Sequence, residues 1–247
     1  MSRPIPKPIP WQRLVLPSFI ALPVLAVLLG LGTWQLQRLQ WKNGLIAELE
    51  AAAAAPPVEA SDSPPAFTRI TATGRLRPAP EAHLGLEVRG TTLGADLVSV
   101  LDRRGGRPLL VIRGWAPLEG GNVQRPEGEV TLSGYARYSD RRAFMAATDD
   151  PAARRFYTFD LRAIAASLGV PDAMPYALAV VVPAGRPAAS GGLGASAPAM
   201  PAVLPDPAGA FPMPNNPHLG YAITWFGLAA AWVVIFALWS IRRVRET

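Results

Sequence analysis

The feature that most constrains this chain is a pair of long apolar segments without a charged residue, one near each end. The first, Leu14–Leu36, has 23 residues, and the second, Leu219–Trp239, has 21. Because a helix rises about 1.5 Å per residue, each segment can cross roughly 30 Å of hydrocarbon. We therefore expect two transmembrane helices, at 14–36 and 219–239.

The positive charge of the chain gathers around these segments. The formal net charge is +6, yet residues 43–217 contain 16 Lys and Arg against 17 Asp and Glu. The excess comes from Arg3, Lys7, Arg13, Arg38, Lys42, Arg242, Arg243 and Arg245. Because basic residues lie outside both ends, the positive-inside rule places residues 1–13 and 240–247 in the cytoplasm and the domain between the spans across the membrane. This distribution indicates membrane lipid, not nucleic acid, as a partner.

A cleaved signal peptide is the alternative reading of the first segment, because a basic stretch precedes it. We expect the segment to be retained, since it is long and its end, GLGTWQ, is a poor small-residue cleavage site.

The part between the spans predicts a β-rich domain. Residues 37–66 read as a helical extension that Pro56 stops, followed by a linker rich in Pro, Ala and Ser. Strand-like runs then occupy 67–76, 82–88, 96–102, 108–117, 129–138 and 176–183, with one short helix capped by Asp160. We expect 67–183 to form a small antiparallel sheet or partly closed barrel, and 184–218, rich in Pro, Gly and Ala, to be a flexible tether. The expected class is a membrane α + β protein in which two transmembrane helices flank a small antiparallel β-rich extracytoplasmic domain.

The soluble part offers no constellation typical of an enzyme. The chain has two histidines, His83 and His218, no cysteine and no glycine-rich phosphate loop. We therefore expect no catalytic residues, and we read His83 as a loop histidine.

His218 differs from His83 because it stands directly before the second span. On the first helix, Trp34, Arg38 and Trp41 are spaced i, i+4, i+7 and share a face, with Lys42 beside Arg38. An imidazole, aromatic faces and two cations at one membrane boundary suit an iron porphyrin with two carboxylates.

A structural alternative explains the same residues without a ligand. Trp34, Trp41, Tyr221 and Trp225 would form an aromatic belt, and the two cations would reach toward lipid phosphates. Against it, cations on the non-cytoplasmic flank oppose the usual charge bias.

Three motifs in this order resemble the Surfeit locus protein family of cytochrome c oxidase assembly factors: LGTWQLQRLQWKNGLI, VIRGWAP and PHLGYAITWFGLA. The resemblance implies a protein of the cell inner membrane, with a periplasmic domain, that helps to insert haem A into oxidase subunit I. Haem A synthase is a candidate second partner.

The resemblance also implies site residues. His218 would be the axial ligand of the haem iron, with Trp34, Gln35, Arg38 and Trp41 as partners on the first helix and Tyr221 and Trp225 on the second. Arg113 and Trp115 match the central motif, and we favour a structural role in which a buried Arg113 stacks on Trp115. A scaffold that stabilises subunit I without binding haem is the alternative function. A sensor or transporter accessory protein is a third, opposed by the lack of a cytoplasmic output module.

Overall fold

The computed structural model describes residues 12–181, 203–207 and 211–245. The chain divides into two compact units, one made of Met1–Glu48 with Pro214–Thr247 and the other of Leu49–Met213. The long helix α1 (Gln12–Ala54) contributes to both units.

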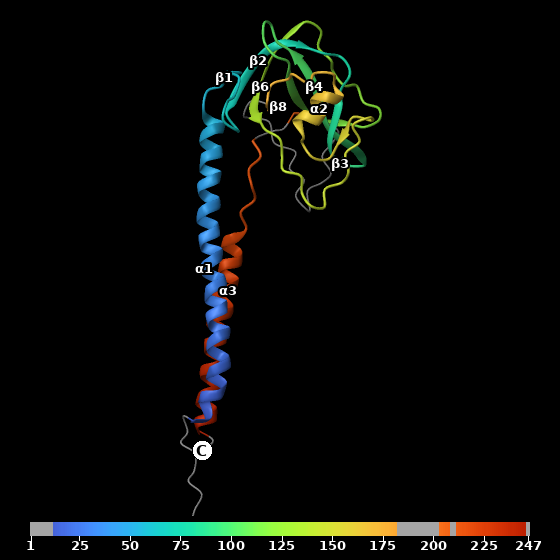
Figure 1. The fold of residues 1–247 in the computed structure, drawn as a ribbon. Coiled ribbons are helices and arrows are strands. Elements are labelled where there is room, and N and C mark those ends of the chain that lie inside the picture. Colours follow the sequence, from blue (N-terminus) through green and yellow to red (C-terminus); the bar gives the residue numbers. More distant parts are fainter. Residues whose placement is uncertain (1–11, 182–202, 208–210, 246–247) are drawn as a thin grey trace, which may run out of the picture. The chain divides into compact units, whose positions relative to one another are not determined.

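The first unit is an antiparallel pair of helices, α1 and α3 (His218–Arg245), which lie side by side (Figure 1). Trp232 Nε1 on α3 donates a hydrogen bond of 3.1 Å to the carbonyl of Ala21 on α1. Gly32 lets the ring of Phe226 approach closely, since a Cβ there would lie 2.8 Å from the ring. Both helices are long and apolar enough to cross a bilayer, and most of their apolar surface faces outward, consistent with a membrane protein.

Helix α1 is continuous through Pro17 and Pro23 and ends at Ala54, two residues before Pro56. A proline cannot donate the backbone hydrogen bond that would continue the helix, which explains the position of this end.

The second unit contains one eight-stranded sheet with the order β1-β2-β6-β8-β5-β4-β3-β7. Its strands are β1 (Val58–Glu59), β2 (Arg69–Leu76), β3 (Ala82–Arg89), β4 (Thr92–Asp102), β5 (Leu109–Pro117), β6 (Glu129–Arg137), β7 (Arg155–Phe156) and β8 (Ala177–Val180).

The sheet closes on itself because β2 also pairs with the end of β4, through Arg75↔Asp102 and Leu76↔Leu101. Strands β2, β6, β8, β5 and β4 thus form a closed ring, while β3 and β7 extend it along the other part of β4. A bulge between Leu97 and Val98 interrupts the pairing of β4 with β5, and bulges of this kind bend strands at barrel corners. The expected fold class, two apolar helices flanking a barrel-like β domain, is confirmed.

Three pairings of the sheet are parallel: β1 with β2, β3 with β7 and β5 with β8. The sequence predicted a small antiparallel sheet or partly closed barrel without these parallel pairings, and it did not identify β1 and β7, which have two residues each. Strand β8 pairs parallel to β5 and antiparallel to β6, and the chain between β5 and β8 contains β6, β7 and helix α2 (Leu161–Ser167).

Helix α2 closes part of the barrel core. Asp160 caps it by accepting a hydrogen bond of 3.1 Å from the amide of Ala163, and Gly169, at φ +73°, follows its end. Its apolar face joins a core formed by both sheet and helix, including Val98, Val100, Leu110, Ile112, Phe156, Phe159, Leu161, Ile164 and Leu168.

Part of the expected tether 184–218 belongs to the domain. Residues 184–202 and 208–210 lie outside the described residues. Leu204 is buried, however, the backbone of Asp206 pairs with that of Trp115 on β5, and Phe211 packs its ring 4.9 Å from that of Tyr135. The sequence did not predict this, because a Pro- and Gly-rich segment with so few apolar residues does not look like part of a core. Its apolar side chains nevertheless pack on the domain.

Candidate functional site

The start of α3 is joined to α1 through the side chains of His218 and Gln35. His218 is the first residue of α3, and its Nδ1 lies 2.7 Å from Oε1 of Gln35. Gln35 is only 9% exposed although it stands in an apolar helix, while His218 is half-buried. A buried amide needs a hydrogen-bond partner, and the imidazole provides it.

This hydrogen bond determines which imidazole nitrogen remains available. Because an amide oxygen only accepts, the tautomer that satisfies this contact has its proton on Nδ1, and in the neutral imidazole of that tautomer the lone pair is on Nε2. Across the ranges that the structure describes, no residue forms a hydrogen bond with Nε2. A neutral imidazole oriented through one nitrogen is the form in which histidine binds a metal through the other.

The residues that lead into α3 are also held by α1. The side chain of Asn216 donates a hydrogen bond of 2.8 Å to Oδ1 of Asn43, and Lys42 Nζ donates to the backbone carbonyl of Asn215. These contacts fix the chain immediately before His218. The sequence analysis did not predict a role for Asn43, Asn215 and Asn216. Two adjacent asparagines beside a transmembrane segment are the pattern that could have indicated one.

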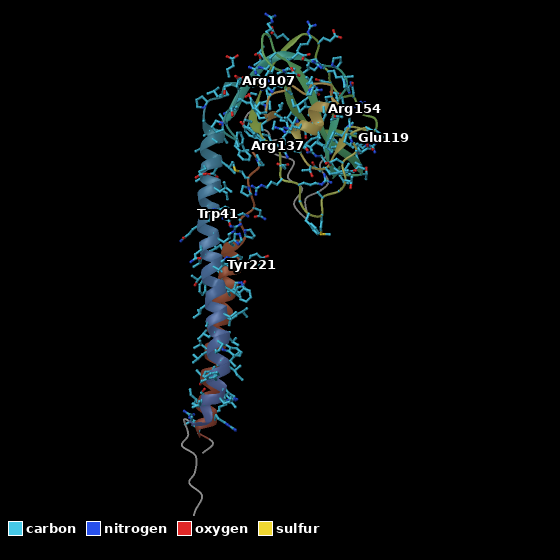
Figure 2. All side chains as sticks on the ribbon, viewed as in Figure 1. Trp41, Arg107, Glu119, Arg137, Arg154 and Tyr221 are labelled. Atoms are coloured by element: carbon cyan, nitrogen blue, oxygen red, sulfur yellow. The ribbon has the colours of Figure 1, made fainter. Side chains whose placement is uncertain are left out.

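The aromatic residues near the start of α3 and on the adjoining part of α1 are largely exposed. Trp34 and Trp41 on α1 and Tyr221 on α3 each keep about half of their surface accessible, with exposed fractions of 53%, 54% and 55%. Figure 2 shows Trp41 on α1 and Tyr221 near the start of α3. Trp225 is half-buried one turn after Tyr221, and spacing places both on the helix face of His218. The exposed rings are available to lipid or to a flat apolar ligand.

The two cations differ in their contacts. The guanidinium of exposed Arg38 lies 4.0 Å from the centre of the Trp41 ring, a cation–π contact. Lys42 is half-buried and already has the carbonyl of Asn215 as a partner. No hydrogen bond or ion pair joins Arg38 to another of the described residues, so its donors are available on the helix face of Trp34 and Trp41.

The RGW motif of the domain is structural in its contacts, although its stacking differs from our expectation. Trp115 is fully buried, and its Nε1 donates a hydrogen bond of 3.1 Å to the carbonyl of Glu87. The cation over its ring is Arg89, at 5.0 Å, and not Arg113, which instead pairs with Glu81 at 3.1 Å. The expectation of an Arg113–Trp115 stack was wrong because it assumed local pairing within one strand, whereas Arg89 reaches Trp115 from β3.

Comparison with known proteins places these features in a family context. The model of the SURF1 family matches residues 22–230. Surfeit locus protein 1 of Homo sapiens is 29% identical over 243 residues, covering 86% of this chain and 73% of the human protein. The mouse protein of that name is 28% identical over 251 residues, covering 90% of this chain and 74% of its own. A SURF1-like protein of Rickettsia conorii is 24% identical over 233 residues and covers 91% of both chains.

Proposed function

The chain belongs to the SURF1 family, and on this premise we propose that it is a non-catalytic assembly factor for a haem-copper cytochrome c oxidase. Its task in this proposal is to hold haem A as cargo at the outer boundary of the membrane and to yield it to oxidase subunit I. The positive-inside rule supports cytoplasmic termini and a domain on the other side of the membrane. The family resemblance implies that this membrane is the cell inner membrane and that the domain is periplasmic.

The single observation that carries the haem-binding proposal is the hydrogen bond between Gln35 and His218. It orients the imidazole and leaves Nε2 as a donor to iron, at the point where α3 enters the apolar region. A second-shell hydrogen bond to a ligating histidine is the usual way in which proteins fix its tautomer and its ring orientation.

The surrounding residues fit the rest of a haem molecule. The exposed rings of Trp34, Trp41 and Tyr221 offer apolar faces to the macrocycle, and Trp225 adds a half-buried one. Arg38 has donors for a propionate carboxylate, while Lys42 would have to share its ammonium with the Asn215 carbonyl.

The proposed site favours reversible binding. His218 would supply a single protein ligand to the iron, which would leave the haem able to take a further ligand from subunit I. The half-exposed aromatic residues leave an exit on the lipid side. Haem A synthase is the proposed donor, and the β domain is the proposed docking surface for subunit I.

The experiment is to co-express the chain with a haem A pathway, purify it in detergent and measure the Soret band per chain. His218→Ala should lose most of the band. His83→Ala is the matched control, because His83 lies in β3 of the domain and should keep wild-type occupancy. Equal occupancy in both variants would exclude His218 as the ligand.

The alternative, a scaffold that never ligates haem, predicts a different result in cells. Oxidase assembly would then survive His218→Ala and fail when the β domain is disrupted. If His218→Ala loses both its Soret band and assembly of the oxidase, while the chain remains in the membrane, the haem-binding proposal is supported over the scaffold.

A further inference from the structure

A cavity in the β domain has four arginines among its nine lining residues. Its volume is about 490 Å³, and it lies between the end of β2, the middle of β5 and the loop that precedes β6. Its charged lining residues are Arg75, Arg77, Arg113, Arg125 and Glu127. The neutral ones are Leu76, Pro78, Pro126 and Gly128.

Two of these arginines share one buried carboxylate. Glu81, whose side chain is 8% exposed, accepts from Arg113 at 3.1 Å and from Arg125 at 2.6 Å. Ser99 also donates to Glu81, at 2.9 Å, so this carboxylate is fully engaged. Arg113 is itself 9% exposed, and burial lowers its pKa in spite of Glu81, with Arg125 lowering it further. The trio therefore carries a net charge of +1, shared between buried Arg113 and partly exposed Arg125, and Glu127 is a further carboxylate in the cavity lining.

Arg75 adds a further positive charge. Within the described part of the chain no residue forms an ion pair or hydrogen bond with its side chain. Glu129 lies directly opposite Arg75 across β2 and β6, but its carboxylate pairs with Arg104 at 3.1 Å instead. The donors of Arg75 thus remain available at the cavity wall.

The remaining arginine is neutralised. Arg77 makes two hydrogen bonds of 2.8 Å to the two carboxylate oxygens of Asp102. Arg77 therefore lines the cavity without adding net charge, and the bidentate pair holds its side chain in one geometry.

We propose that this cavity binds an oxyanion of the phosphate type, held by Arg75 and Arg125 and by the charge of buried Arg113. Guanidinium forks match phosphate oxygens with paired N–H donors. The positive charges of Arg75 and of the Arg113–Arg125–Glu81 trio outnumber the negative charge of Glu127, so an anion is favoured here. The phosphate group could come from free phosphate or from a lipid headgroup, and the chemistry of the site is the same for both.

The test uses the full-length chain in an uncharged detergent and phosphate-free buffer, titrated with inorganic phosphate by calorimetry and by thermal unfolding. Wild-type protein should bind saturably and unfold at a higher temperature with phosphate. Arg75→Gln should weaken binding by about tenfold, because it removes charge-assisted hydrogen bonds. Since Arg75 has no protein partner among the described residues, this variant should fold normally.

Two further variants keep the result interpretable. Arg125→Gln leaves Arg113 paired with Glu81 and should show a similar loss. Arg162→Gln, an exposed arginine on α2 outside the cavity, should bind as wild type does. No saturable binding to wild type, or equal affinity in all variants, would overturn the proposal.

A short-chain phosphatidic acid distinguishes the two sources. Tighter binding than phosphate, with the same loss in Arg75→Gln, would assign a lipid headgroup, and equal affinity would assign the free anion. Lipid binding that does not change in Arg75→Gln would contradict the site.

Discussion

The hydrogen bond between Gln35 and His218 joins side chains that are 183 positions apart in the sequence, at a distance of 2.7 Å. It ties the start of α3 to α1 and selects the imidazole tautomer whose Nε2 has a free lone pair. An amide in an apolar helix would otherwise carry a desolvation cost, so the same contact stabilises the helix pair and prepares the histidine.

Replacing Gln35 tests whether this orientation matters for the ligand. Gln35→Leu removes the acceptor for Nδ1–H, so the imidazole is free to rotate, and haem retention should fall by about 10- to 100-fold. Retention is measured as the Soret absorbance that remains after dialysis against a haem acceptor. Gln37→Leu, at an exposed position of the same helix, should retain haem normally. Equal retention in the two variants would show that Gln35 does not position His218.

The packing of α1 against α3 can be tested at two glycines of α1. A Cβ at Gly32 would lie 2.8 Å from the Phe226 ring, whereas a Cβ at Gly30 has nothing within 4 Å. Gly32→Leu should therefore lower the free energy of unfolding in detergent by roughly 1–3 kcal/mol, as overpacking does. Gly30→Leu should leave it near the wild-type value, and a similar loss in both variants would contradict the close approach of Phe226.

Gly114 in the RGW motif is required where Asp206 crosses β5. Its φ is +116°, and a Cβ would lie 2.1 Å from the Asp206 carbonyl oxygen. Gly114→Ala should displace residues 203–207 and destabilise the domain by about 1–3 kcal/mol or more, from backbone strain and the clash. Proteolysis after residue 203 should accelerate, while Gly106→Ala, with only a distant neighbour at 3.7 Å, should behave as wild type. Unchanged proteolysis in Gly114→Ala would argue against this contact.

The carboxylate of Asp96 on β4 gives the domain a specific dependence on pH. Burial raises its pKa above the ordinary value of 3.8, and Arg137 opposes this only in part. The folded state therefore binds the proton more tightly than the unfolded state, so stability falls as the pH rises through the raised pKa. Asp96→Asn should raise the free energy of unfolding at neutral pH.

The pH profile supplies the control for this prediction. The gain from Asp96→Asn should shrink toward zero as the pH falls below the ordinary pKa of 3.8, because the carboxyl is then neutral in both the folded and the unfolded state. Chemical denaturation at several pH values measures this difference. A gain that is the same at all pH values would rule out titration of Asp96 as its cause.

Local signals explain how much of the fold could be predicted. The spans follow from length and composition, and the cap at Asp160 follows from residues within one helical turn. Closure of the barrel through β2 and β4 could not be predicted, because it depends on register between strands about 25 residues apart and on a bulge at Leu97. The contact of Asp206 with Trp115 is equally remote from any local pattern.

The candidate site shows the same division. The position of His218 before a span was visible in the sequence, and the family resemblance, now confirmed, added Gln35 as a partner. The hydrogen bond between the two residues was not predictable, because it depends on how far along α1 the start of α3 lies. The hydrogen bond from Lys42 to Asn215 could not be predicted either, because its acceptor is a backbone carbonyl, which every residue type has.

Rescue of a ligand-deleted variant by free imidazole tests directly whether His218 binds the haem iron. His218→Gly removes the imidazole and leaves a space for a diffusible one. We expect His218→Gly to lose its haem A Soret band and to regain it with saturable dependence on imidazole concentration, while His83→Gly keeps its band throughout. Retention of the full band in His218→Gly without imidazole would contradict the claim that His218 binds the iron.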